Sequence, residues 1–168
     1  MDILLVNGFL SAVTISYATL TGLTLFNSDV KLENPNKLFF NSSERENRYQ
    51  DYNRASFALA ISILVANIIL FILVKWYRKN LNLAIFYIYS LFFLLLAAIY
   101  YGLIGGLIFK DLQLNSNYIS KQSILNWIYA FILFISAIAI IISGKKLNKN
   151  NQKSSSSGST KPSSLTSS

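Results

Sequence analysis

The stretch AAIYYGLIGGLIF, residues 97–109, decides the kind of fold that this chain adopts. It lies inside a long apolar run and contains Gly102, Gly105 and Gly106. In a soluble helix, each glycine would cost about 1 kcal/mol relative to alanine. The segment is therefore either not a helix, or it is a helix that uses the flat surface its glycines create.

The charged residues are absent from four long stretches. The chain of 168 residues is 53% hydrophobic and 13% charged, with a net charge of +8, whereas a soluble domain has about 25% charged residues. Every Asp, Glu, Lys and Arg lies outside the apolar runs 3–26, 55–74, 83–109 and 123–143. Each run matches the about 20 residues that a helix needs to cross a bilayer. We therefore predict an all-α integral membrane protein, with four transmembrane helices in a bundle over residues 1–144.

Two alternatives for these runs are weaker. Buried helices of a soluble bundle would keep a polar face at helical spacing, and ILFILVKW (residues 69–76) and LFFLLLAAI (residues 91–99) show none. The first run also lacks the basic start of a cleaved signal peptide and is longer than its apolar core of about 7–15 residues. We therefore interpret residues 3–26 as a membrane span.

The distribution of basic residues predicts the topology. The segment 75–80 and the tail 145–168 carry lysine or arginine and no acid, and cytosolic loops are rich in both. The outside loop, residues 27–54, has five basic residues, which weakens the count. We predict that both termini are cytosolic, in the endomembrane system or the plasma membrane. Asn41, in the acceptor sequence Asn-Ser-Ser, is then a predicted glycosylation site on the luminal side.

The outside loop and the tail have different compositions. The loop is interpreted as partly disordered, and the alternative is that Leu38, Phe39 and Phe40 dock at the membrane interface. Residues 145–168 are rich in Lys, Asn and Ser, which predicts a disordered tail. Lys145, Lys146 and Lys149 can bind anionic lipid at about 1 kcal/mol each. The alternative is that the tail only sets topology and solubility.

Small residues mark two faces for helix packing. In lipid, helices associate through close van der Waals contact, which small residues four positions apart allow. The third run carries such a stripe, and the first run carries small or polar residues at alternating intervals of four and three, as in a left-handed seam. The stripe is Ala98, Gly102 and Gly106, and the seam is Asn7, Ser11, Thr14, Ala18 and Thr21. We predict that these surfaces pack on each other or on a partner chain.

Isolated polar and aromatic residues add detail inside the spans. Asn67 is the deepest amide, and it needs a hydroxyl or amide partner from another helix. The pairs Trp76 and Tyr77, and Trp127 and Tyr129, are typical of the aromatic belts at membrane interfaces. Tyr100 and Tyr101 lie deeper than a belt requires, so lining a groove is the alternative for them.

The residue types exclude most catalytic chemistry. The chain has no Cys and no His, so thiol nucleophiles, His-based triads and ordinary zinc sites are excluded. We expect no enzyme activity, no cofactor and no metal. The expected partners are the lipid bilayer and other membrane proteins or a second copy, but no nucleic acid. The sequence favours an accessory or scaffold protein. The alternative is a subunit of an oligomeric channel or transporter, with a pore lined by Thr14, Thr21 and Asn67.

Overall fold

The computed structural model describes residues 2–26, 42–77, 81–111 and 117–156, and all its regular elements are helical. The third apolar run is one continuous rod, in which a π-helical segment separates two α-helical parts. The elements are α1 (Ile3–Phe26), α2 (Ser42–Trp76), α3 (Leu83–Ile88), η1 (Tyr89–Leu95), α4 (Leu96–Asp111) and α5 (Asn117–Ser156). The prediction of an all-helical chain is confirmed for these residues.

Four helices are long and apolar enough to cross a membrane, as predicted. Their apolar windows are Ile3–Leu23, Gln50–Trp76, Leu83–Ile108 and Gln122–Gln152. Charged side chains would be expensive at the centre of a bilayer, and the windows keep them near the helix ends. The four apolar helices therefore indicate an integral membrane protein.

Two helices continue beyond the predicted spans. Helix α2 begins at Ser42, inside the predicted outside loop, and α5 continues to Ser156, inside the predicted disordered tail. Extending an existing helix adds one hydrogen bond for each residue fixed, so a polar sequence can follow an apolar span without a new nucleus. Leu147 also buries its side chain, and the Lys145 ammonium lies 5.8 Å from the centre of the Tyr87 ring. Residues 145–156 are thus helical rather than disordered.

Several predictions fall on residues that the structure does not describe. These are the glycosylation site Asn41, the apolar triplet Leu38, Phe39 and Phe40, and the last part of the tail, residues 157–168. They stay predictions from the sequence.

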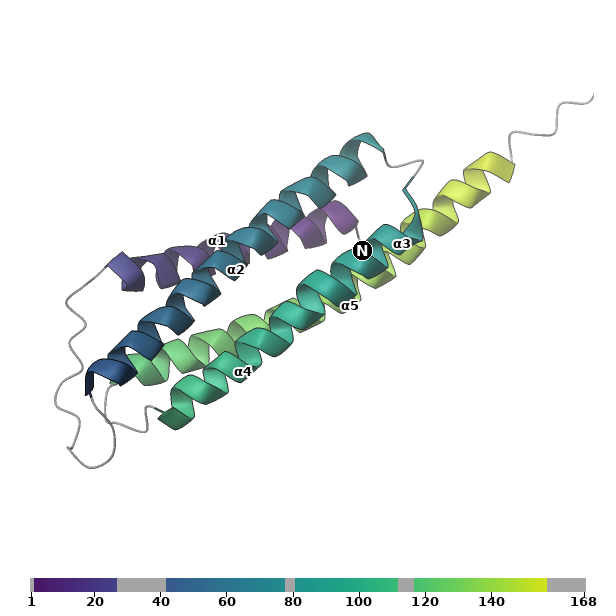
Figure 1. Cartoon of the computed structure of the whole chain (residues 1–168). Helices are drawn as coiled ribbons and strands as arrows, with labels where there is room; N and C mark the ends of the chain where they lie inside the picture. The colour runs from purple at the N-terminus through teal and green to yellow at the C-terminus, as the bar shows by residue number, and fades with distance from the viewer. Residues whose placement is uncertain (1, 27–41, 78–80, 112–116, 157–168) are drawn as a thin grey trace, which may run out of the picture.

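The four long helices run up and down in chain order (Figure 1). Helix α1 packs on α2 and α5, and α4 packs on α5. Because successive helices alternate in direction, the start of α1 lies at the same end of the bundle as the last turns of α5. In a membrane that all four helices cross, the start of α1 and the end of α5 would lie on the same side.

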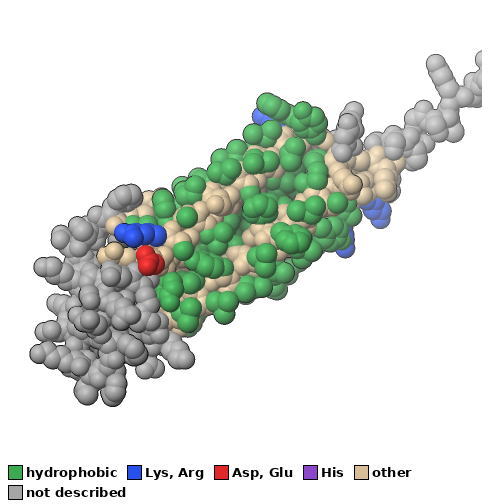
Figure 2. Space-filling model, viewed as in Figure 1, with side chains coloured by type: hydrophobic (Ala, Val, Ile, Leu, Met, Phe, Trp, Pro, Cys, Tyr) green, Lys and Arg blue, Asp and Glu red, His purple; other side chains and the backbone are tan. Residues whose placement is uncertain are grey.

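The surface is apolar around the middle of the bundle and the interior is partly polar. Figure 2 shows hydrophobic side chains along the face in view, with lysine and arginine toward the ends. Leu5, Phe92 and Phe131 are each about two-thirds exposed, at 66%, 66% and 65%. In contrast, Asn67 and Asn126 are both 0% exposed. Lipid solvates such an exterior, and the buried polar groups then need partners inside the bundle.

Candidate functional site

The polar seam of α1 faces the interior of the bundle. Asn7, Thr14, Ala18 and Thr21 are buried, and Ser11 is partly buried. On the other side of the same helix, Leu5, Phe9 and Leu20 are exposed and Val13 is partly exposed. Since α1 packs on α2 and α5, its small residues lie against those two helices.

The stripe on α4 is divided between the inside and the outside. Ala98 is buried. An added Cβ at Gly102 or Gly106 meets no heavy atom within 4 Å among the residues that the structure describes. Over the same described ranges, α4 has no backbone contact with α1. The stripe and the seam therefore do not pack on each other within this part of the chain, and contact of the stripe with a partner chain stays a prediction.

Gly105 is the glycine at which α4 and α5 approach closely. A Cβ there would lie 2.6 Å from Cδ1 and Nε1 of Trp127, and 3.2 Å from the carbonyl oxygen of Ser123. Two hydrogen bonds cross the same contact. The Ser123 hydroxyl donates to the Gly105 carbonyl at 2.6 Å, and the Trp127 indole N–H donates to the Gly102 carbonyl at 3.2 Å. The absence of a side chain at Gly105 makes room for the indole ring.

Sequence reasoning did not single out Gly105 or Gly144. An added Cβ at Gly144 would lie 2.6 Å from Cγ of Phe86, so α3 and α5 also meet at a glycine. The repeat of small residues drew attention to Gly102 and Gly106 instead. Trp127 on α5 is the residue that could have pointed to Gly105, because a large ring needs a small residue opposite it. That pairing is visible only after α4 and α5 are aligned.

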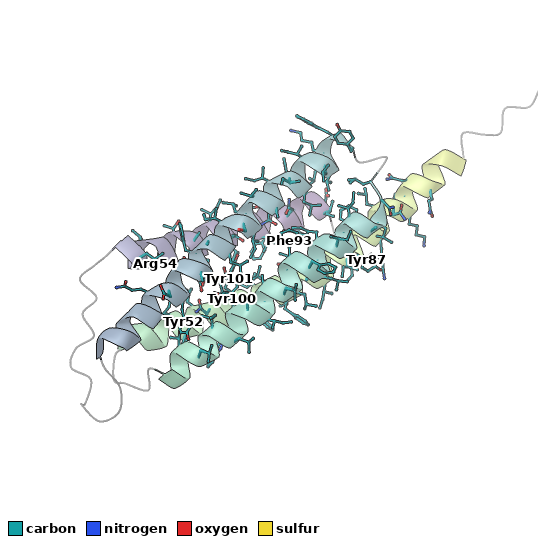
Figure 3. The ribbon with its side chains drawn as sticks, in the orientation of Figure 1. Tyr52, Arg54, Tyr87, Phe93, Tyr100 and Tyr101 are labelled. Atoms are coloured by element: carbon teal, nitrogen blue, oxygen red, sulfur yellow. The ribbon has the colours of Figure 1, made fainter. Side chains whose placement is uncertain are left out.

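Three tyrosines from α1, α4 and α5 form an aromatic core, which we call the tyrosine cluster: Tyr17, Tyr101 and Tyr129. The rings of Tyr17 and Tyr129 stack with centres 4.1 Å apart, and Tyr101 lies edge-on to them at 5.1 and 4.8 Å. All three side chains are at most 2% exposed. Figure 3 shows Tyr101 and Tyr100 between α2 and α4.

Each hydroxyl of the tyrosine cluster donates a hydrogen bond to another helix. The bonds run from Tyr17 to Oδ1 of Asn126 at 2.5 Å, from Tyr129 to Oγ1 of Thr14 at 3.0 Å, and from Tyr101 to the carbonyl oxygen of Ser56 at 2.7 Å. The Thr14 hydroxyl in turn donates to the carbonyl oxygen of Leu10 at 2.7 Å. The cluster therefore joins all four long helices through rings that fill space and hydroxyls that have acceptors.

The predicted aromatic belts are only partly correct. Trp76 and Tyr77 are exposed at one end of the bundle, at 72% and 57%, as a belt requires. Tyr129, which was assigned to a belt, lies in the tyrosine cluster, as does Tyr101. The physical reason is that a tyrosine hydroxyl can be buried wherever a neighbouring helix offers an acceptor.

A second polar group, which we call the amide cluster, consists of Asn7, Asn67 and Tyr89. Nδ2 of Asn7 donates to the carbonyl oxygen of Asn67 at 2.8 Å, and the Tyr89 hydroxyl donates to Oδ1 of Asn67. Asn67 thus obtains the hydroxyl partner from another helix that its sequence position requires. Tyr89 is the first residue of η1, and π-helical turns occur frequently at functional sites.

The two clusters offer neutral hydrogen-bonding groups rather than charges. Neither contains an Asp, Glu, Lys, Arg or His side chain, which are the groups that mark most ion and proton pathways in membranes. Together, their hydrogen bonds connect all four long helices. Comparison of the chain with protein-family models, curated proteins and solved structures gives no match.

Proposed function

We propose that this chain is a non-catalytic multi-pass membrane protein that acts as an accessory or scaffold for other membrane proteins. The observation that carries the proposal is the outer face of α4. Gly102 and Gly106 leave a flat strip there, bordered by exposed Ile99 and Leu103, at 52% and 64%. The chain fills the space beside Gly105 with its own Trp127, whereas its described residues leave the space beside Gly102 and Gly106 open.

Such a strip suits a transmembrane helix of another protein. Lipid tails gain little from a flat helix surface, but a second helix can approach it closely and gain van der Waals contact along its backbone. The Gly102 carbonyl already accepts a hydrogen bond from the indole N–H of Trp127. A partner helix would therefore bind the strip through van der Waals contact rather than through a hydrogen bond to this carbonyl.

The test is recovery of partners in mild detergent after crosslinking. We expect a defined heterologous membrane protein with the wild-type chain, and loss of that protein with Gly102→Leu or Gly106→Leu. Leu103→Ile is the matched control, because it changes the shape of an exposed neighbour without filling the strip. Equal recovery from all three variants would mean that the strip faces lipid.

The alternative function is a subunit of an oligomeric channel or transporter, which the polar interior favours. Thr14, Thr21 and Asn67 are fully buried in the single chain, so a pore lined by them requires the bundle to rearrange between copies. Purification as a homo-oligomer, with ion flux after reconstitution into liposomes, would support this alternative against the scaffold function.

For location, we propose the endomembrane system or the plasma membrane, with cytosolic termini and a glycan on Asn41. The support is the acid-free basic composition of segments 75–80 and 145–168. Protease protection of a C-terminal tag tests the topology, and a luminal tag would reverse it. Asn41→Gln should remove one glycan, and the variant should therefore migrate faster than the wild-type protein on a gel.

We also propose anionic lipid as a partner of Lys145, Lys146 and Lys149. All three side chains are exposed on α5, which contains no acidic residue along its whole length. Native mass spectrometry tests this proposal, by measuring whether the purified protein retains phosphatidylserine in preference to phosphatidylcholine. The preference should weaken when all three lysines are changed to Gln, and an unchanged preference would exclude them as the binding site.

A further inference from the structure

We infer that the amide cluster holds bound water inside the bundle. This inference is independent of the proposed scaffold function, since it concerns the interior and not the outer face of α4. Oδ1 of Asn7 and Nδ2 of Asn67 are buried and have no hydrogen-bond partner among the residues that the structure describes.

Leaving these atoms without a partner is unfavourable. A buried polar atom that loses its hydrogen bond costs about 1–3 kcal/mol, and the large majority of buried side-chain polar atoms in proteins have a partner in protein or ordered water. Asn7 is 2% exposed and Asn67 is 0% exposed, so bulk solvent does not supply the bonds. In our proposal, an enclosed water molecule donates to Oδ1 of Asn7 and accepts from Nδ2 of Asn67, and so satisfies both atoms.

The Asn67 amide leaves one atom without a described partner in either of its two orientations. The Tyr89 hydroxyl contacts one terminal atom of that amide, and a hydroxyl both donates and accepts. Turning the amide by 180° exchanges its oxygen and nitrogen, but one of the two still lacks a partner. The orientation of the Asn7 amide is set by its hydrogen bond, because only Nδ2 can donate to the carbonyl oxygen of Asn67, and Oδ1 is therefore the atom that lacks a partner among the described residues.

The chemistry of the cluster selects water over an ion. Asn7 offers an acceptor and Asn67 a donor, and water both donates and accepts. The charged side chains that the structure places are Asp2 and Lys75 at helix ends, Asp51 and Arg54 in the first half of α2, and Lys145, Lys146 and Lys149 in the extension of α5. An ion would therefore meet no opposite charge at Asn67, which lies about 14 Å along α2 from Trp76.

The residue next to Tyr89 carries a further side-chain hydroxyl without a described partner. Ser90 follows Tyr89 in η1, is 0% exposed, and its hydroxyl has no partner within the described ranges. Buried waters in proteins make about three hydrogen bonds each to otherwise unsatisfied groups. Ser90 thus adds an unsatisfied polar group one residue from the amide cluster, within the π-helical segment.

The experiment is water-edited solid-state NMR on the full chain in liposomes, with ¹⁵N-labelled asparagine and leucine. Magnetisation is transferred from mobile water to nearby N–H groups, and the side-chain signal of Asn67 is identified by its loss in Asn67→Leu. We expect the Asn67 side chain to receive magnetisation several-fold faster than the amide of Leu133, which is 0% exposed among apolar side chains. The exposed side chain of Asn82 provides the upper reference.

Two outcomes decide the inference. Build-up at Asn67 as slow as at Leu133 would mean a dry cluster and would overturn it. A second measurement uses Asn7→Leu, which removes one polar partner of the water. We expect the build-up at Asn67 to slow several-fold while that at Asn82 stays unchanged. An unchanged rate at Asn67 would overturn the assignment of the water to this pair of residues.

Discussion

Helix α4 has glycine on both its inner and its outer face, and the glycines of the two faces have different surroundings. The inner face consists of Ala98, Tyr101, Gly105 and Ile108, and the outer face of Ile99, Gly102, Leu103 and Gly106. On the inner face, glycine makes room for Trp127 of α5. On the outer face, two glycines leave a strip that the described part of the chain does not fill. Adjacent glycines, Gly105 and Gly106, thus differ in role because a helix turns by about 100° between them.

The largest effect should come from Tyr101→Ala on the inner face. The ring contacts Tyr17 and Tyr129, and its removal leaves a large cavity among four helices. We expect the free energy of unfolding to fall by about 3–5 kcal/mol, as for other buried aromatic residues changed to alanine. Reversible unfolding in mixed micelles with increasing SDS measures the change.

Tyr101→Phe is the matched control, because it keeps the ring and removes only the hydrogen bond to Ser56. Its loss should be about 1 kcal/mol. Equal losses for the two variants would show that the hydroxyl, and not the packing of the ring, stabilises the inner face.

A smaller effect is expected for Gly105→Leu, which overpacks the contact with α5. The new side chain meets the Trp127 indole and the Ser123 carbonyl, and overpacking typically lowers stability by about 1–3 kcal/mol. Unfolding in SDS measures this loss, and Trp127 fluorescence in a Trp76→Phe background should shift as the indole moves. A stable variant with an unshifted spectrum would disprove the close approach at Gly105.

The smallest effect on stability is expected for Gly102→Leu on the outer face. Its side chain points into space that the described residues leave open, so the free energy of unfolding of the purified chain should stay within about 0.5 kcal/mol of wild type. A loss as large as that of Gly105→Leu would mean that the purified chain already packs this face against a second copy. Unfolding at several protein-to-detergent ratios would detect such a copy.

The sequence by itself determined that there are four apolar helices and which face of α1 points into the bundle. Burial in lipid depends on composition summed over about 20 residues, so the absence of charge over each run is sufficient evidence. The interior position of Asn7, Thr14 and Thr21 follows from their shared helical face, since polar groups avoid hydrocarbon. The polar extension of α5 to Ser156 was missed, because local composition does not record how far an existing helix propagates.

Only the tertiary structure decided which of these residues meet. The sequence named the glycines of α4 but could not distinguish Gly105, which contacts Trp127, from Gly106, for which no such contact is described. It likewise placed Tyr129 at an interface, although its ring stacks on Tyr17 from a helix more than a hundred residues away in the chain. Such contacts depend on the rotation and axial position of each helix relative to its neighbours. Both are set by packing of the whole bundle and not by any local pattern.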